Sequence, residues 1–92
     1  MSAARFELGR VVVTREALAA CLGEEVAPSE LLARHASGDW GDVPHGDAYQ
    51  NEYGLRHGLR VFSSHPLPSG TRVWIITEAD RSSTTILLPH EY

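Results

Sequence analysis

The chain has 92 residues and a formal charge of −4, and 42% of its residues are hydrophobic while 22% are charged. This length suits one domain spanning residues 1–92, and the composition excludes an intrinsically disordered chain. The net acidity disfavours general binding to nucleic acid or to anionic lipid surfaces. The single cysteine, the lack of a secretory signal pattern in MSAARFELGR and the lack of a long apolar run favour a cytoplasmic protein without membrane spans.

The first half of the chain predicts one short strand and two helices. Residues 6–13 end in three valines and favour a strand, and Thr14 can cap the helix expected over residues 15–23. The apolar stripe of that helix is expected at Ala17, Leu18, Cys21 and Leu22. Cys21 is therefore expected in the core rather than in catalysis. A second helix is expected to start at Pro28 and to turn Leu31 and Leu32 inward.

Residues 38–46, GDWGDVPHG, hold so many turn formers that no regular structure is expected across most of them. Trp40 in this loop has two interpretations. It is either a plug that closes a small core, which we favour, or an exposed anchor for a partner. A third helix is expected over residues 48–58, capped by Asp47, with Tyr49 and Tyr53 on one half-buried flank.

The last third of the chain has the most regular pattern. Residues 60–65, 71–77 and 83–88 are typical of strands, separated by a proline-containing turn and by the turn EADRS at residues 78–82. Sequential strands usually pair, so we expect an antiparallel meander. The strand over 71–77 is apolar on both faces, so helices should cover one face and the other should be partly covered or used. The predicted fold class is α+β: a short N-terminal strand, two to three helices, then a three-stranded antiparallel meander with helices packed on one face.

The five histidines do not follow a metal-binding pattern. His57 and His65 could approach one another with Asp42 or Asp47 as a further ligand, but the spacings typical of zinc sites are missing. Scattered histidines of this kind are usually surface residues. We therefore expect no metal and no cofactor.

Two sets of residues are candidate sites. The binding set joins the loop of residues 38–46 to the EADRS turn and comprises Asp39, Trp40, Asp42, Asp80 and Arg81. It offers an aromatic anchor with a charged rim, as a protein interface requires, although Asp and Ser in such a turn also bond to the backbone for purely structural reasons. The catalytic set comprises His65, Arg60, Glu78, Arg81 and Thr85. It follows from the layout of small ribonucleases and toxins of the barnase and RelE kind, which also place helices before an antiparallel sheet.

Several strings resemble one family. They are FELG from Phe6, ELLARHASGDWGD from Glu30 to Asp42, Asn51, the segment from Gly58 to Pro89, and the closing Glu91 and Tyr92. With them the chain resembles a family of small uncharacterised proteins of plasmids and other mobile elements, labelled plasmid-related or type I restriction subunit. Residues 43–54 depart from the plainer, more charged helix of that family. The resemblance implies a mobile-element role and no particular reaction.

These observations together predict a non-enzymatic module that binds or regulates another protein. The alternative is a ribonuclease or a toxin-like enzyme, against which the net acidity argues, because proteins that cut RNA are usually basic. We expect a protein partner, neither nucleic acid nor a membrane, and a monomer or homodimer.

Overall fold

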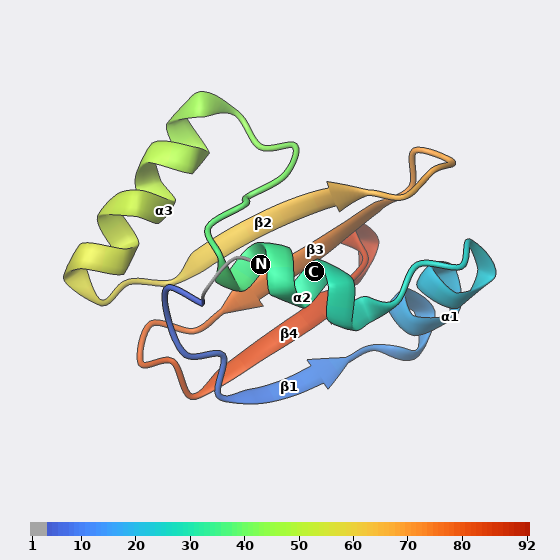
Figure 1. Ribbon diagram of the computed structural model, residues 1–92, viewed down its shortest axis with the longest axis horizontal. Helices are drawn as coiled ribbons and strands as arrows, with labels where there is room; N and C mark the ends of the chain where they lie inside the picture. The colour runs from blue at the N-terminus through green and yellow to red at the C-terminus, as the bar shows by residue number, and fades with distance from the viewer. Residues whose placement is uncertain (1–3) are drawn as a thin grey trace.

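The structure is a computed structural model that describes residues 4–92. Within these residues it contains one four-stranded sheet, three α-helices and a final short 3-10 helix (Figure 1). In chain order the elements are β1 (Arg10–Val13), α1 (Arg15–Gly23), α2 (Pro28–Ala36), α3 (His45–His57), β2 (Val61–Pro66), β3 (Arg72–Thr77), β4 (Ser83–Leu87) and η1 (Pro89–Glu91). The fold is α+β, as the sequence predicted.

The strand order in the sheet is β1-β4-β3-β2. The last three strands form the predicted antiparallel meander, in which Trp74 lies between Ser64 on β2 and Leu87 on β4. β1 pairs with the other edge of β4 in the parallel direction, with Val12 opposite Thr85. A parallel pair needs a long crossover connection, and the helices between β1 and β4 provide it. The sheet is therefore mixed, a feature that the predicted meander alone did not include.

α1 and α2 pack on one face of the sheet, which we call the helix side (Figure 1). The core there joins Val73, Ile75 and Ile86 of the sheet to Ala17, Cys21 and Leu31 of the two helices. Thr14 caps α1 by accepting the backbone N–H of Ala17, and Pro28 occupies the first turn of α2, so both predictions are confirmed. Cys21 is fully buried, as predicted, and burial raises the pKa of its thiol.

α3 lies beside β2 at the edge of the sheet rather than on either face (Figure 1). The side-chain amide of Asn51 donates to the carbonyl of Phe62 at 2.6 Å, and its oxygen accepts the Phe62 N–H at 2.9 Å. This one side chain therefore takes the place of a neighbouring strand. The packing of α3 on β2 holds a helix that its sequence, with Gly54 inside, stabilises poorly by itself.

The opposite face of the sheet carries no α-helix from residues 4–92, and we call it the open face. Strand register assigns to it every second residue: Arg10, Val12, Phe62, Ser64, Pro66, Arg72, Trp74, Ile76, Ser83, Thr85 and Leu87. η1 brings Tyr92 back onto this face, where its ring lies 5.8 Å from that of Trp74. In the described part of the chain, no helix has the length and apolarity that crossing a bilayer requires.

Four predictions about individual positions are wrong. Leu18 and Leu22 are 40% and 60% exposed, because α1 packs on the core through Ala17, Ala20 and Cys21. α3 begins at His45, so Asp47 lies in its first turn and does not cap it. Tyr49 is 71% exposed, because α3 meets the sheet on the flank that carries Asn51. His35 and His65 are fully buried rather than at the surface, because both extend from elements whose inner sides form the core.

Candidate functional site

Trp40 lies inside the protein, with 7% of its surface exposed. Its indole ring stacks on Phe6 at a centroid distance of 6.1 Å and meets the edge of the His35 ring at 5.7 Å. The indole N–H donates to the carboxylate of Glu52 on α3 at 3.1 Å. This arrangement fits the favoured interpretation, a plug, and it leaves no exposed indole for a partner.

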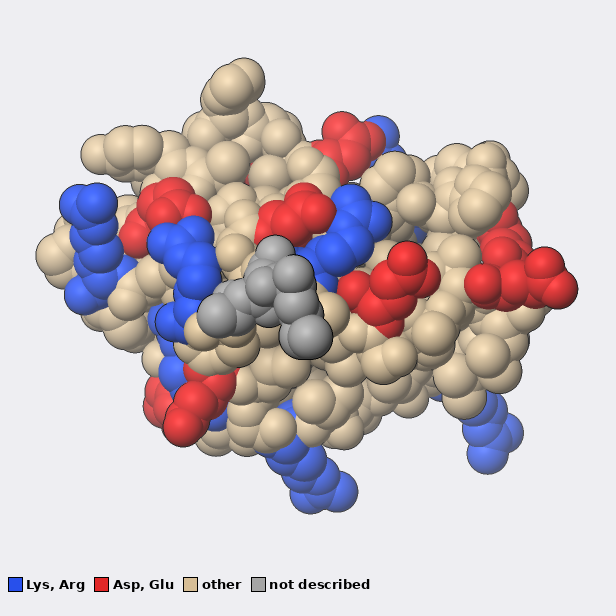
Figure 2. Space-filling view, in the orientation of Figure 1, with Lys and Arg blue, Asp and Glu red and all other residues tan. Residues whose placement is uncertain are grey.

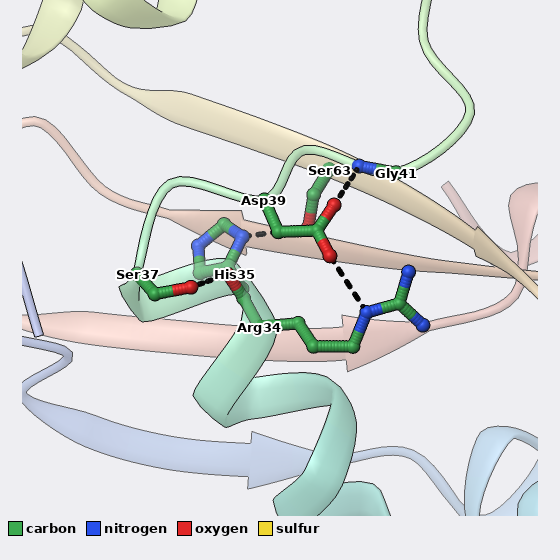
Figure 3. A network of polar contacts seen from close by, with 6 residues as sticks. All are labelled: Arg34, His35, Ser37, Asp39, Gly41 and Ser63. Atoms are coloured by element: carbon green, nitrogen blue, oxygen red, sulfur yellow. Dashed lines mark hydrogen bonds and ion pairs between the residues drawn. The ribbon is translucent and has the colours of Figure 1, made fainter. Parts of the chain in front are cut away.

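The two aspartates of the same loop make structural contacts, and Figure 3 shows those of Asp39. The carboxylate of Asp39 accepts hydrogen bonds from the Arg34 guanidinium at 2.8 Å and from the Gly41 N–H at 3.0 Å. The bond from Arg34 lowers the pKa of Asp39. Asp42 forms an ion pair with Arg72 of β3 at 2.8 Å. Each aspartate therefore ties the loop to a neighbouring element.

The EADRS turn also uses its charged groups on the protein itself. The Asp80 carboxylate accepts the Ser82 N–H at 3.0 Å. Hydrogen bonding from Ser82, first from its side chain and then from its backbone N–H, lowers the pKa of Asp80. Arg81 has a φ of +61°, and its guanidinium donates to the carbonyls of Leu59 at 2.7 Å and of Gly54 at 3.1 Å. Arg81 thus satisfies carbonyl groups around the end of α3. These contacts fit the structural interpretation of the turn, in which its polar side chains bond to the backbone.

The two loops of the predicted binding set do approach each other, but through a third residue. The guanidinium carbon of Arg81 lies 5.6 Å from the centroid of the Phe6 ring, and the same ring stacks on Trp40. Phe6 thus lies between the loop and the turn. The contact is part of the packing of the helix side.

The structure does not bring the predicted catalytic set together. His65 is fully buried on the helix side, at the end of β2 that pairs with Val73, whereas Glu78 follows the opposite end of β3. Arg60 and Thr85 belong to the open face, on the other side of the sheet from His65. Acid–base catalysis needs these groups within hydrogen-bonding reach of one substrate. This arrangement does not provide such a cleft.

A chain of buried polar groups crosses the helix side. Thr84 donates to the carbonyl of Leu8 at 2.7 Å, so its hydroxyl must accept from Thr77, which lies 2.7 Å away. Thr77 in turn must accept from Nε2 of His35 at 2.9 Å, which leaves Nδ1 to accept from the Ser63 hydroxyl at 2.6 Å. Each hydroxyl has one proton to donate, so the bonding fixes His35 as the neutral tautomer with its proton on Nε2.

The surroundings of His35 favour the same neutral form. Burial lowers its pKa to about 3, and the nearby His65 and Arg81 add repulsion in the same direction. A second proton on Nδ1 would also turn the Ser63 hydroxyl into an acceptor and leave its own proton without a partner in the described structure. His35 is therefore a structural residue at neutral pH.

His65 is a buried side chain without polar contacts in the described residues. Neither ring nitrogen has a hydrogen-bond partner among residues 4–92, and Gly41 lies directly against the ring. Burial, followed by repulsion from Arg34, lowers its pKa, while Asp39 acts in the opposite sense. Within the same residues no three histidine, cysteine or acidic side chains converge as metal ligands would. His65 therefore contributes a neutral ring to the core.

The open face holds a hollow of ≈ 210 Å³ lined by Arg60, Phe62, Trp74, Ile76 and Tyr92. The ring of Trp74 stands edge to face against Phe62 at 5.0 Å and against Tyr92 at 5.8 Å. The guanidinium carbon of Arg60 lies 5.8 Å from the centroid of the Tyr92 ring. Three aromatic rings and an arginine thus surround one cavity at the surface of the sheet.

The open face is also basic along its strands. Its strand positions include Arg10 and Arg72 and no acidic residue, and Arg60 lies at the hollow. Asp42 pairs with Arg72, and Asp47 lines a neighbouring hollow with Arg60, so Arg10 and Arg60 are its arginines without an ion pair in the described residues. The helix side differs, because acidic and basic side chains lie next to one another across it (Figure 2). The negative net charge of the chain therefore does not describe the open face.

A second hollow, of ≈ 290 Å³, follows the outer flank of α3 and is lined by Tyr49, Glu52, Tyr53, Arg56 and His57. All of its lining comes from one helix, and the carboxylate of Glu52 is already bonded to Arg5 and to Trp40. The hollow on the open face is formed by two strands and the returning tail, so the sheet fixes its shape. We take the open face as the candidate functional site.

Sequence reasoning assigned no site residue to this hollow except Arg60. One sequence feature does point to a surface on this side of the sheet. The strand over residues 71–77 is apolar on both faces, although the helices can cover only one of them. No family model matches the chain, and the searches of curated proteins and of solved structures likewise found no similar protein.

Proposed function

We propose that the protein is a non-enzymatic binding module of mobile elements that engages a protein partner through the open face of its sheet. The observation that carries the proposal is the hollow in which Trp74, Tyr92 and Arg60 meet at the surface. Trp, Tyr and Arg are the residues that most often dominate the energy of protein interfaces. The mobile-element role rests on the resemblance of the sequence strings alone.

The size of the hollow supports a side chain of a partner as its occupant. Pockets for small molecules commonly start at about 300 Å³, and this one measures ≈ 210 Å³. Its rings stand edge to face, so they form walls rather than the flat platforms on which nucleobases stack. An apolar or aromatic side chain of a protein partner suits such walls better than a base does.

Charge complementarity supports an acidic partner segment. Arg10, Arg60 and Arg72 are exposed, and only Arg72 pairs with an acidic side chain among residues 4–92. Complementary potentials steer association and disfavour wrong partners. The proposed ligand is therefore a protein segment in which carboxylates flank one large apolar residue. No observation favours the ribonuclease alternative, since its residues lie on both sides of the sheet.

A peptide-display selection tests this proposal. Random peptides of about a dozen residues would be selected on the purified protein, and we expect enrichment of acidic residues around an aromatic or large aliphatic one. Arg60→Glu and Tyr92→Ala should each weaken binding of the selected peptides by about tenfold or more. Both positions are exposed, so neither change disturbs the core. Tyr49→Ala, at a tyrosine of similar exposure on α3, is the matched control and should leave binding unchanged.

Three results would overturn the proposal. They are a failure to select any peptide, selected peptides that bind the Arg60→Glu variant as tightly as the unchanged protein, and preferential binding of a single-stranded RNA oligonucleotide. The last result would assign the open face to nucleic acid instead.

A further inference from the structure

The two edges of the sheet differ in how their backbone groups are satisfied. At the β2 edge, Asn51 bonds both backbone groups of Phe62, the Trp40 carbonyl accepts the Ser64 N–H at 3.1 Å, and the Asp42 N–H donates to the Ser64 carbonyl at 2.6 Å. The loop and α3 thus close this edge to further strands. The β1 edge, at the lower margin of the sheet in Figure 1, has no comparable cover in the described residues.

The hydrogen bonds of β1 show which of its groups face outward. The N–H of Arg10 donates to Ser82 and the N–H of Thr14 donates to Ile86, both on the β4 side. Backbone groups alternate in direction along a strand, so the N–H and C=O groups of Val11 and Val13 point away from β4. None of them has a partner within residues 4–92, and the Val11 and Val12 side chains are 41% and 43% exposed. An edge of this kind is a template for another strand.

We infer that a second copy of this chain occupies the β1 edge, with its own β1 antiparallel. Centring a two-fold axis on Val12 places Val11 opposite the second copy's Val13, and the reverse pair follows by symmetry. Each outward N–H and C=O group then gains a partner, because Val11 and Val13 offer matched donors and acceptors. The two exposed Val12 side chains meet on the open face, where a pair of β-branched residues stabilises a sheet.

The charges at the two ends of β1 suit this antiparallel arrangement. Arg10, at the start of the strand, is exposed and has no acidic partner among residues 4–92. At the other end, the Thr14 hydroxyl bonds to Glu91 at 2.7 Å, and Glu16 lies in the first turn of the helix that Thr14 caps. The two-fold axis brings Arg10 of each copy to Thr14 and these carboxylates of the other. A parallel pairing would bring like charges together instead.

The dimer would join two four-stranded sheets into one and place both open faces on the same side. A partner segment with two anchors could then bind both hollows, which raises avidity without any new contact. The contact between short strands is small, so the dimer belongs to the weak, concentration-dependent class. This inference goes beyond the proposed function and does not depend on it.

Sedimentation and amide hydrogen exchange test the dimer together. Sedimentation should show a monomer at low micromolar concentration and a dimer near millimolar concentration. The amides of Val11 and Val13 should exchange more slowly as the concentration rises, while the Val12 amide, already bonded to β4, should not change. Val12→Glu, which places like charges opposite each other, should weaken association by about tenfold or more. Leu22→Glu, at an exposed leucine of α1, is the control and should dimerise normally.

Charge reversal tests the orientation of the two strands. Arg10→Glu should weaken the dimer, and the double variant Arg10→Glu with Glu16→Arg should restore it. The inference would be overturned if the wild-type protein stayed monomeric at millimolar concentration. It would also be overturned if the exchange rates of the Val11 and Val13 amides did not depend on protein concentration. A dimer that tolerates both Val12→Glu and Arg10→Glu would overturn it as well.

Discussion

Trp40 and Trp74, the two tryptophans of the chain, lie on opposite sides of the sheet. Trp40 is 7% exposed and packs against Phe6 and His35 on the helix side. Trp74 stands between Phe62 and Tyr92 on the open face. One indole therefore stabilises the fold, while the other lines a hollow that a partner can reach. The NMR signal of each indole N–H therefore reflects the surroundings of that tryptophan on its own side of the sheet.

Because two histidines are buried, the free energy of unfolding changes with pH at values above those at which the carboxylates titrate. His35 has a pKa of about 3 in the folded state against an ordinary value of 6.5. Below about pH 6.5 the unfolded chain binds a proton that the folded protein does not, so the free energy of unfolding falls as the pH falls. The slope is about 1.4 kcal/mol per pH unit for one such histidine, and His65, whose pKa burial also lowers, steepens it.

Urea unfolding at pH 7, 6 and 5 measures this slope. The depressed pKa values of Asp39 and Glu52 act at more acidic pH and leave this window largely to the histidines. His35→Gln retains a donor and an acceptor but cannot titrate, so it should reduce the slope. A slope equal in the variant and the unchanged protein would mean that His35 does not stay neutral.

Asn51 should be one of the most sensitive polar residues in the chain. Its side chain is 4% exposed and bonds both backbone groups of Phe62 on β2. Asn51→Ala leaves that N–H and that C=O without a partner, at a cost of about 1 to 3 kcal/mol for each buried group. Chemical denaturation should show this loss, while Gln50→Ala at the exposed neighbouring position should stay within about 0.5 kcal/mol of wild type. A loss below 1 kcal/mol would show that water replaces the Asn51 contacts.

Gly41 should tolerate no side chain. It has a φ of +70°, and a methyl group there would meet the carbonyl of Ser64 and the ring of His65. Gly70 has a φ of +94° with open space around it, so Gly70→Ala isolates the backbone cost of about 1 to 2 kcal/mol. Gly41→Ala should cost more than this, because the loop must also move away from β2. Equal losses of unfolding free energy in the two variants would contradict the close packing of Gly41 on His65.

The architecture could be predicted largely because its signals are local. The β-rich runs that became β3 and β4, the proline at the start of α2 and the Thr14 cap each act within a few residues. The parallel pairing of β1 with β4 joins residues more than 70 positions apart, for example Arg10 and Ser83. No turn sets such a register. It depends on the packing of the whole helix side.

The site could not be predicted because a residue type does not show which way its side chain faces. Trp40 stood out in a loop rich in glycine, yet Phe6 and His35 close over it. Trp74 lies in a strand that is apolar on both faces, and only the one-sided placement of α1 and α2 leaves it at the surface. Asp80 and Arg81 have the chemistry of a site but use it on Ser82 and on the backbone around α3.

The most direct test of the open face as the working surface uses the two indole N–H signals in a heteronuclear NMR spectrum. A display-selected acidic peptide should shift the Trp74 signal in proportion to occupancy and leave the Trp40 signal in place, since Trp40 is enclosed on the other side of the sheet. A peptide that binds while the Trp74 signal stays fixed and the Trp40 signal moves would contradict the account.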